Sequence, residues 1–219
     1  MALLADFGTT WTKLIDTETG KTSIERSSVI DIHADLATGN NARTRSQASV
    51  NELIALYEGG LTSIKEKDFI IVDIGSRDLK YIKVVGERVE QMDWSTSCGT
   101  LTGFTLELLA GYFNIDYNTL EPSNRVDPIT CGLLGIERLF ERLANGTSIG
   151  EAVAAFTRSI ALNAYHFIGR PEKFYLSGGM CENRLFISSF SDNVEVIPLG
   201  RFVLLDGVIK EYERRLKKK

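Results

Sequence analysis

The sequence has little of several features that would mark particular classes of protein. Its 219 residues include 4 prolines, 3 cysteines and 2 histidines. No apolar run approaches the ~18 residues that a membrane-spanning helix needs, and Met1 is followed by an apolar segment rather than a basic one. We therefore expect neither a signal peptide nor a membrane span. Cysteines this few, without CxxC spacing, argue against a disulfide scaffold and favour a cytoplasmic chain.

The charge balance also excludes some functions. The 25 basic and 29 acidic residues give a net charge of -4 and are mixed along the chain, so the sequence lacks the basic footprint of a nucleic-acid-binding protein. The one basic run lies at residues 214–219 and is interpreted as a solvated helix terminus. The hydrophobic content of 43% is enough for the core of one large domain or two small ones.

One motif occurs twice. Residues 6–13 read DFGTTWTK after the apolar run 2–5, and residues 73–80 read DIGSRDLK after the apolar run 69–72. Each copy has an Asp, an apolar residue, a Gly and a hydroxyl residue, with a Lys seven positions after the Asp. The repeat indicates a duplicated structural unit.

Each copy is typical of a strand, a tight turn and a second strand in a hairpin. The glycine of such a turn lets backbone N–H groups approach an anion. Two such turns facing one another could hold the phosphates of a nucleotide, with Asp6 and Asp73 coordinating Mg²⁺ directly or through water. Two ordinary hairpins in a duplicated scaffold are the alternative that the residues alone leave open.

Hydrophobic periodicity gives a coarse map of the rest of the chain. It predicts strands at 2–7, 12–16, 23–32, 69–73, 80–85, 88–93, 174–177 and 194–198. It predicts helices at 50–57, 101–113, 132–143, 149–168 and 202–216, with Gly59-Gly60 ending the first helix and Gly86-Glu87 forming a hairpin turn. Duplicated strand-rich halves with added helices indicate a two-lobed α/β fold with a cleft between the lobes.

A third motif, YLSGGMCEN at residues 175–183, makes the likeness specific. With the two Asp-x-Gly motifs, it resembles the phosphate-1, phosphate-2 and adenosine motifs of the actin-like ATPase superfamily, whose fold is a two-lobed, ribonuclease H-like α/β structure. The narrower resemblance is to the activators (component A) of 2-hydroxyacyl-CoA dehydratases, the benzoyl-CoA reductase ATPase subunits and the double-cubane-cluster protein reductases. It is carried by residues 37–39, 73–80, 98–107, 131–146 and 158–160.

The resemblance implies a division into lobes and a set of site residues. Residues 1–68 with 200–219 would form a first lobe, shortened between Ser28 and Ala37, and residues 69–199 a second. ATP or ADP would bind with Mg²⁺ in the cleft between them. Asp6 and Asp73 would position Mg²⁺ and water, and Asp78 would have a supporting polar role. The residues expected to contact the nucleotide are Gly8, Thr9, Thr10, Lys13, Gly75, Ser76, Gly178, Gly179 and Asn183.

Arg77 departs from the family pattern. The family's second phosphate loop usually reads Gly-Gly-Gln-Asp, whereas this chain has Gly75-Ser76-Arg77-Asp78. A cation replaces the amide that would orient water. We consider Arg77 a candidate catalytic residue that stabilises phosphate charge, with a simple ion pair as the alternative.

Two of the cysteines precede predicted helices. Taken alone, three cysteines would be interpreted as buried or reduced thiols. Cys98 and Cys131, however, each come just before an amphipathic helix, whose N-terminus stabilises a thiolate. In the family the cysteines at these positions bind iron. Cys181 lies in the adenosine motif and is interpreted as structural.

Counting ligands predicts an assembly. A 4Fe–4S cluster normally has four thiolate ligands, and one chain offers two at suitable positions. A homodimer would therefore share one cluster on its two-fold axis. The resemblance implies ATP-driven transfer of one electron to an iron–sulfur dehydratase or reductase, with ferredoxin or flavodoxin as the upstream donor.

Two other classes of function stay open. A small-molecule kinase would use the same cleft, with Asp73 or Asp78 as the base, although it normally has a larger acceptor-binding insertion. A regulatory or assembly ATPase would keep the nucleotide motifs while Cys98 and Cys131 served as core residues. Iron content separates the activator from both alternatives.

Overall fold

The computed structural model describes residues 2–95, 102–129, 132–190 and 193–218. The chain forms two compact units. The first comprises residues Met1–Ile71, Ile82–Met92 and Leu199–Lys219, and the second comprises residues Val72–Tyr81 and Asp93–Pro198. These units are defined by contacts within the structure, whereas the lobes expected from the sequence are defined by the repeated motif. The predicted lobe boundaries at residues 68–69 and 199–200 therefore stay a prediction.

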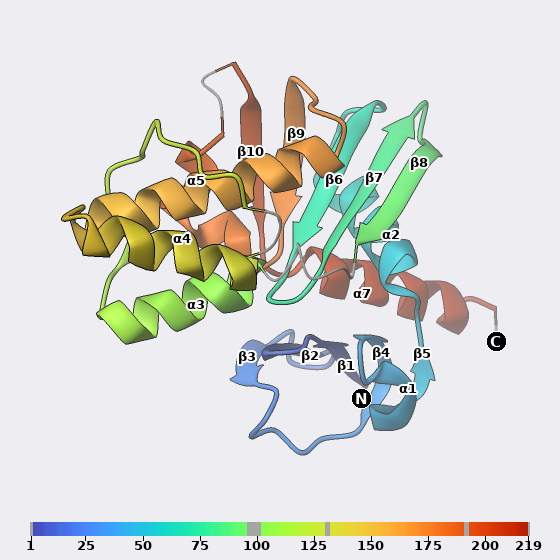
Figure 1. The fold of residues 1–219 in the computed structure, drawn as a ribbon. Coiled ribbons are helices and arrows are strands. Elements are labelled where there is room, and N and C mark those ends of the chain that lie inside the picture. The colour runs from blue at the N-terminus through green and yellow to red at the C-terminus, as the bar shows by residue number, and fades with distance from the viewer. Residues whose placement is uncertain (1, 96–101, 130–131, 191–192, 219) are drawn as a thin grey trace. The chain divides into compact units, whose positions relative to one another are not determined.

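A five-stranded sheet of order β3-β2-β1-β4-β5 lies in the first unit (Figure 1). Its strands are β1 (Leu3–Phe7), β2 (Trp11–Asp16), β3 (Thr22–Arg26), β4 (Ala34–Gly39) and β5 (Ser46–Ser49). The apolar run of β1 makes it the central strand, because four of its five residues are buried. It pairs antiparallel with β2 and parallel with β4, and this arrangement sets the position of every residue in the first motif.

The predicted third strand is too long. β3 ends at Arg26 rather than at residue 32, because the backbone turns there. The N–H groups of Val29 and Ile30 both donate to the carbonyl of Arg26, at 3.0 and 3.2 Å. The chain then enters β4, a strand that the periodicity did not predict.

Helices α2 (Glu52–Ser63) and α7 (Val203–Leu216) pack against one another in the first unit, which also contains the short α1 (Ala42–Arg45). The prediction that Gly59-Gly60 ends α2 is wrong, since the helix continues to Ser63. A Cβ atom on Gly59 would overlap the carbonyl of Val203, and one on Gly207 would overlap the carbonyl of Ala55. These glycines allow two backbones to approach closely and do not stop a helix.

The second sheet has the order β10-β9-β6-β7-β8. Its strands are β6 (Phe69–Ile74), β7 (Leu79–Val85), β8 (Arg88–Ser95), β9 (Lys173–Ser177) and β10 (Glu195–Gly200). The hairpin turn predicted at Gly86-Glu87 is confirmed, and both residues have positive φ, at 56° and 62°. The first six residues of β8 are exposed, as suits a strand at the edge of a sheet.

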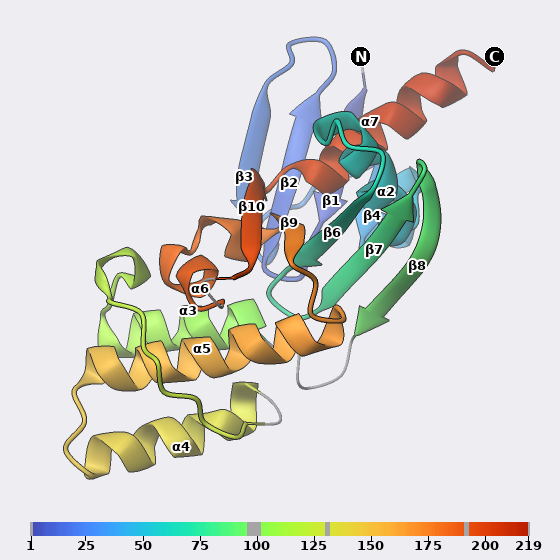
Figure 2. The same cartoon turned by 90° about the horizontal axis from the view of Figure 1, so that it is seen from above.

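Three helices of the second unit lie side by side, as both views show (Figure 1, Figure 2). They are α3 (Thr102–Phe113), α4 (Gly132–Ala144) and α5 (Ile149–Phe167), and the shorter α6 (Arg184–Ser188) follows β9. The bounds of α3, α4 and α5 agree with those of the predicted helices to within one residue. Ser148 caps α5 by accepting a bond from the Glu151 N–H. The α/β class predicted from the sequence is confirmed. In the described part of the chain, no helix has both the length and the apolar character required to cross a bilayer.

Two helical glycines offer a matched test of this packing. Gly207→Ala should lower the free energy of unfolding by about 1–3 kcal/mol, because the new methyl group meets the backbone of α2. Gly111→Ala in α3 should instead raise it by about 0.5–1 kcal/mol, because the Cβ position is open and alanine favours a helix. Urea unfolding measures both values. Equal effects of the two substitutions would contradict the close approach of α2 and α7.

Candidate functional site

The first phosphate loop follows from the register of β1 and β2. Asp6 is the direct cross-strand partner of Lys13, and the Lys13 Nζ lies 2.7 Å from Asp6 Oδ2. Asp6 is only 3% exposed, so its charge requires a partner at this distance. The spacing of seven residues in the sequence is therefore the spacing of a cross-strand ion pair close to the turn of a hairpin.

Neighbouring segments hold the tip of this hairpin in place. Gly8 lies where a Cβ atom would come within 2.5 Å of the Trp11 carbonyl oxygen. Ser27 braces the tip, since its Oγ donates to the Gly8 carbonyl at 2.8 Å and its N–H donates to the Thr10 carbonyl at 2.9 Å. The exposed Thr9 accepts a bond of 2.7 Å from the Asn40 amide. The loop at residues 8–10 is thus fixed within its own unit.

The stretch at residues 37–39, which carries part of the family resemblance, lies beside this loop. β4 runs parallel to β1 and places Thr38 next to Asp6 and Gly39 next to Phe7. Gly39 has a φ of 99°, and a Cβ atom there would overlap the Phe7 backbone. This position therefore requires glycine.

The second phosphate loop contains a larger polar network. The Lys80 Nζ lies 3.0 Å from Asp78 Oδ1 and 3.8 Å from Asp73 Oδ2, and Lys80 is 2% exposed. Asp78 also accepts a bond of 2.9 Å from the indole N–H of Trp94, and the Lys80 ammonium lies 5.0 Å from the centre of the Trp94 ring. One buried cation thus serves two buried carboxylates and an aromatic face.

The rest of this loop is exposed to a similar degree as the first. Gly75 and Ser76 are partly buried and Arg77 is exposed. The nearest atom to a Cβ on Gly75 would be Asp78 Oδ1, at 3.4 Å, which is ordinary contact distance. Packing within the described residues therefore does not require glycine at position 75.

The adenosine motif meets the second phosphate loop at Asp73. The Ser177 hydroxyl donates to Asp73 Oδ1 at 3.0 Å, and both residues are buried. Gly178 has a φ of 85°, and a Cβ atom there would overlap the carbonyl of Ile74. The structure thus brings Gly178 next to the end of β6.

Gly179 and Asn183 have local structural roles beyond those expected from the sequence. Gly179 begins a single 3₁₀ turn, Gly179–Glu182. The Asn183 Oδ1 accepts a bond of 2.9 Å from the N–H of Phe186 and so caps α6. The cap leaves the amide NH₂ group of Asn183 for a ligand.

Cys98 and Cys131 lie outside the described residues. The helices expected after them are present, with α3 beginning at Thr102 and α4 at Gly132. The two helices run in the same direction, and the rings of Tyr112 and Phe140 pack edge to face between them, 6.0 Å apart (Figure 1). Cys181 is a buried thiol outside any disulfide, and its structural role stays a prediction.

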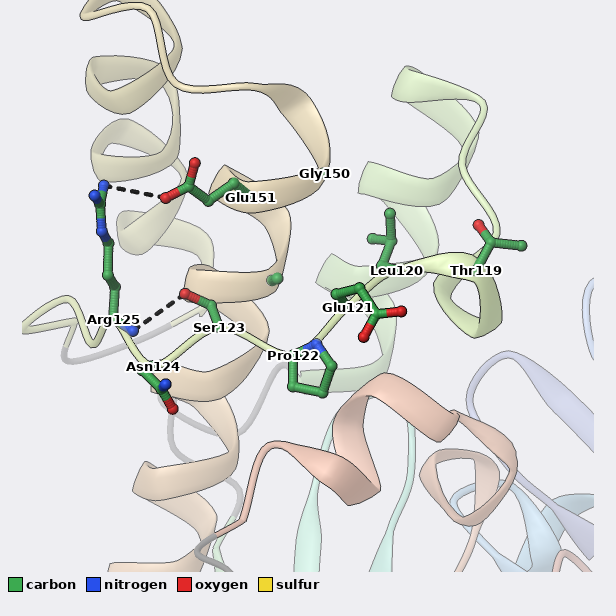
Figure 3. Close-up of a pocket in the computed structure, with 10 residues that line it drawn as sticks. Thr119, Leu120, Glu121, Pro122, Ser123, Asn124, Arg125, Gly150 and Glu151 are labelled. Atoms are coloured by element: carbon green, nitrogen blue, oxygen red, sulfur yellow. Dashed lines mark hydrogen bonds and ion pairs between the residues drawn. The ribbon is translucent and has the colours of Figure 1, made fainter.

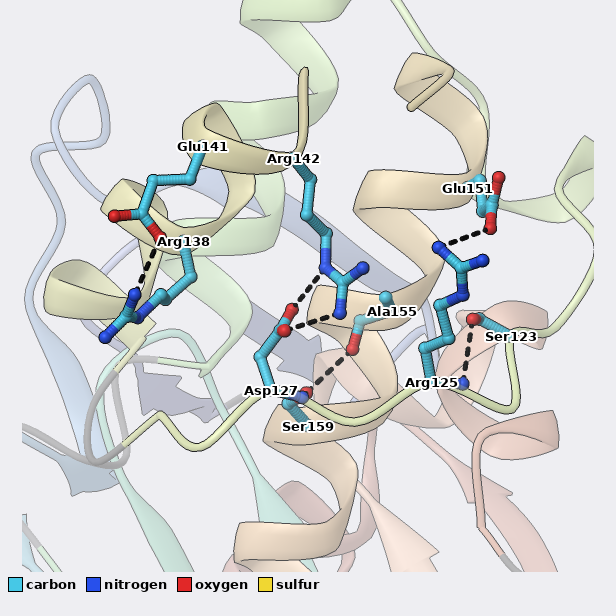
Figure 4. A network of polar contacts seen from close by, with 9 residues as sticks. All are labelled: Ser123, Arg125, Asp127, Arg138, Glu141, Arg142, Glu151, Ala155 and Ser159. Atoms are coloured by element: carbon cyan, nitrogen blue, oxygen red, sulfur yellow. Dashed lines mark hydrogen bonds and ion pairs between the residues drawn. The ribbon is translucent and has the colours of Figure 1, made fainter. Parts of the chain in front are cut away.

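The segment before α4 is fastened to α4 and α5 (Figure 4). Arg142 binds both carboxylate oxygens of Asp127, at 2.8 and 2.5 Å, and the Asp127 N–H donates to the Ser159 hydroxyl at 2.7 Å. The hydrogen bonds between Arg142 and the Asp127 carboxylate raise the pKa of the Arg142 guanidinium. The Asn163 amide donates to the Ile129 carbonyl at 2.8 Å. The main chain is therefore well anchored up to residue 129.

A pocket of about 450 Å³ lies elsewhere in the second unit (Figure 3). It is formed by residues 119–125 and the first turns of α5, and an ion pair between Arg125 and Glu151, at 3.2 Å, lies in its wall. None of the site residues predicted from the sequence line it.

The donor chemistry of the two loops fits a hard cation such as Mg²⁺. Asp6 in the first loop and Asp73 in the second each carry a carboxylate within their own unit. Mg²⁺ typically takes one or two protein carboxylates and completes its shell with water and phosphate. Within residues 2–95, 102–129, 132–190 and 193–218, no group of three or more His, Cys, Asp or Glu side chains could hold a metal ion. A site of this kind would depend on the nucleotide for its remaining ligands.

Sequence reasoning missed three residues of the second loop's network, namely Lys80, Trp94 and Ser177. A signal for Lys80 was present, because it repeats the position of Lys13. Trp94 and Ser177 lie 16 and 104 residues from their partners, Asp78 and Asp73. Pairing at such separations leaves no periodic signal in a single sequence.

Two lysines of β7 test the importance of this network. Lys80→Met should lower the free energy of unfolding by about 3–5 kcal/mol, because it leaves Asp73 and Asp78 buried without their cation. Lys83→Met is the matched control, since Lys83 pairs with Glu90 at the surface, and it should cost at most about 1 kcal/mol. Thermal and urea unfolding measure the difference. A Lys80 variant as stable as the Lys83 variant would contradict the pairing.

Comparisons with solved structures identify similar folds. The activator of the 2-hydroxyisocaproyl-CoA dehydratase from Clostridium difficile, with bound ADPNP, matches with a TM-score of 0.78 and 18% identity, over 100% of this chain and 98% of that one. Component A of the (R)-2-hydroxyglutaryl-CoA dehydratase from Acidaminococcus fermentans matches with a TM-score of 0.73 and 17% identity, over 95% and 94% of the two chains.

A candidate 2-dehydro-3-deoxygalactonokinase from Sinorhizobium meliloti matches with a TM-score of 0.59 and 12% identity, over 99% of both chains. No protein-family model matches the sequence, and no curated protein does. Identities this low establish a fold and not an activity. The resemblance to the dehydratase activators is thus confirmed in structure: the chain has the fold of these two proteins.

Proposed function

We propose that this chain is an ATP-dependent activator that uses ATP binding and hydrolysis to deliver a low-potential electron to an iron–sulfur dehydratase or reductase. The observation that carries the proposal is a buried aspartate beside a lysine in each copy, Asp6 with Lys13 and Asp73 with Lys80, next to a glycine turn. They occur in a chain whose structural neighbours include two dehydratase activators, one of them with bound ADPNP.

The first loop would contact phosphate through its backbone and its cation. The N–H groups of residues 8–10 and the hydroxyls of Thr9 and Thr10 suit phosphate oxygens. Lys13 is partly exposed, with 13% of its side chain accessible, so it can reach an anion while it stays close to Asp6. A lysine shared between a carboxylate and a phosphate contributes charge without leaving Asp6 unpaired.

The second loop would complete the contacts. Gly75 and Ser76 would bind phosphate, Asp73 would act with Asp6 on Mg²⁺ and water, and Asp78 would hold Lys80 in place. Gly178, Gly179 and Asn183 would lie against the adenosine. Bound Mg²⁺ would supply electrostatic stabilisation of the phosphate charge that develops during hydrolysis. Arg77, which is exposed, would either add to this stabilisation or form an ion pair.

The cysteines would provide the electron-carrying site. Cys131 immediately precedes α4, and Cys98 precedes α3 by a few residues, so both thiolates would gain from the positive end of a helix. Two such cysteines from each of two chains supply the four thiolates of one 4Fe–4S cluster per homodimer. This cluster would carry one electron, received from a ferredoxin or flavodoxin.

The nucleotide part of the proposal is tested by two nearly isosteric substitutions. Asp6→Asn and Asp73→Asn should each reduce MgATP hydrolysis at least about tenfold, because each removes a carboxylate needed for Mg²⁺ and water. Asp31→Asn is the control, since its side chain is exposed, and it should hydrolyse ATP at the parent's rate. Phosphate release measures all three. Parental rates in both Asp6 and Asp73 variants would overturn the site.

The electron-carrying part is tested by three cysteine substitutions under anaerobic conditions. Cys98→Ser and Cys131→Ser should each remove the iron and weaken the dimer, because the cluster would be part of the interface. Cys181→Ser should do neither, since this buried thiol is not one of the four proposed ligands. Iron analysis and native mass give the result. A Cys181 variant without iron, or a Cys98 variant that keeps it, would sink the assignment.

A small-molecule kinase is the second candidate, supported by the fold shared with the candidate 2-dehydro-3-deoxygalactonokinase. It would use the same loops, with Asp73 or Asp78 as the base. A colourless, iron-free protein that transfers phosphate from ATP to a small alcohol would favour this function over the activator.

A further inference from the structure

The second phosphate loop, residues 75–78, bonds directly to the start of α3. The N–H of Phe104, in the first turn of α3, donates to the Ser76 carbonyl at 3.0 Å. The first N–H groups of a helix have no partner within the helix, so a carbonyl from another segment serves as their acceptor. Gly103 makes this approach possible, because a Cβ atom there would lie 2.7 Å from the Gly75 carbonyl oxygen and 3.1 Å from the Ser76 Cα.

The same loop also bonds to the end of β8. The Trp94 indole donates to Asp78 Oδ2 at 2.9 Å, one residue before the strand ends at Ser95. A hydrogen bond to an ionised carboxylate is stronger than one between neutral groups. Lys80 reinforces it, since it pairs with the other Asp78 oxygen at 3.0 Å and lies over the indole ring.

We propose that Asp78, Trp94 and Gly103 are positioning residues that couple the second phosphate loop to β8 and α3. Ser76 lies between the two contacts in the loop, so a change in its peptide alters the carbonyl that holds α3 or the backbone that carries Asp78. A phosphate bound at Gly75 and Ser76 therefore shifts both elements. This coupling rests on the proposed function, which puts a nucleotide at this loop.

The elements on either side of residues 96–101 are thereby attached to one short loop. Trp94 precedes this stretch and Gly103 follows it in the sequence, and Cys98 lies within it. Through this coupling, nucleotide binding would affect Trp94 and Gly103, which lie on either side of the proposed ligand Cys98 in the sequence. That route consists of two hydrogen bonds and one backbone contact, all within the second unit.

The fluorescence of Trp94 can report the coupling at β8. It has 2 tryptophans, so Trp11→Phe leaves Trp94 as the sole source of indole fluorescence. Saturating MgADP should shift the emission of Trp94 in this variant, because the indole N–H and ring both contact groups held by the loop. The variant Trp94→Phe retains only Trp11, which follows the first phosphate loop, so it measures separately the emission change that the nucleotide causes at that loop.

Hydrogen exchange reports the coupling at α3. MgADP should slow exchange of the first-turn amides of α3 at least about threefold in the parent and in Gly111→Ala, whose added methyl group meets open space. Gly103→Ala should lose this response at saturating MgADP, because its Cβ forces the loop and the helix apart. If Gly103→Ala fails to fold, the fluorescence of the Trp11→Phe variant decides.

Equilibrium dialysis of MgADP separates the possible results. Binding without any change in Trp94 emission or α3 exchange would overturn the coupling and leave the proposed function intact. A Gly103→Ala response equal to that of Gly111→Ala would also overturn it. Failure of the parent to bind MgADP at all would overturn both the coupling and the proposed function.

Discussion

The buried pair of an aspartate and a lysine across a hairpin is the constraint on which both loops depend. A buried carboxylate is tolerated only with a cation or several hydrogen-bond donors close by. In the first loop, Lys13 meets this requirement from the position directly opposite Asp6 on the neighbouring strand. A shift of one residue in the strand pairing would point Lys13 to the other face of the sheet, so the pair also fixes the register and with it the glycine turn.

The buried aspartate is paired differently in the two copies of the motif. Asp6 and Lys13 form a single pair, and the turn beside them is braced by Ser27 and Asn40 from the same unit. In the second copy, Lys80 is shared by Asp73 and Asp78, and the loop is bonded to α3 and β8. The first loop is thus held by segments of its own sheet and the residues that follow its strands, whereas the second is held by the start of α3 and the end of β8.

The sequence allowed local features to be predicted better than long-range ones. The β1–β2 hairpin and helices α3 to α5 follow from apolar runs and periodicity, because these patterns depend on near neighbours. The predicted end of α2 at Gly59-Gly60 was wrong. Gly59 is needed there because the backbone of α7, which begins at Val203, packs closely against it. Of the site, the two aspartates and Lys13 were found by repetition, while Trp94 and Ser177 pair across separations that no single-sequence pattern records.

The start of α3 and the segment before α4 are held in different ways, and this difference bears on how a nucleotide could change them. The segment before α4 is fastened to α4 and α5 themselves, by the bidentate pair of Asp127 with Arg142 and by the bond between Ile129 and Asn163. The end of β8 and the start of α3 are attached to the second phosphate loop. A nucleotide acting on that loop would therefore displace α3 relative to a frame of α4 and α5. The proposed thiolate ligands precede α3 and α4, so a movement of one helix relative to the other would change the environment of the cluster more than a movement of both together. The reduction potential of such a cluster depends on the hydrogen bonding and solvent exposure of its sulfurs.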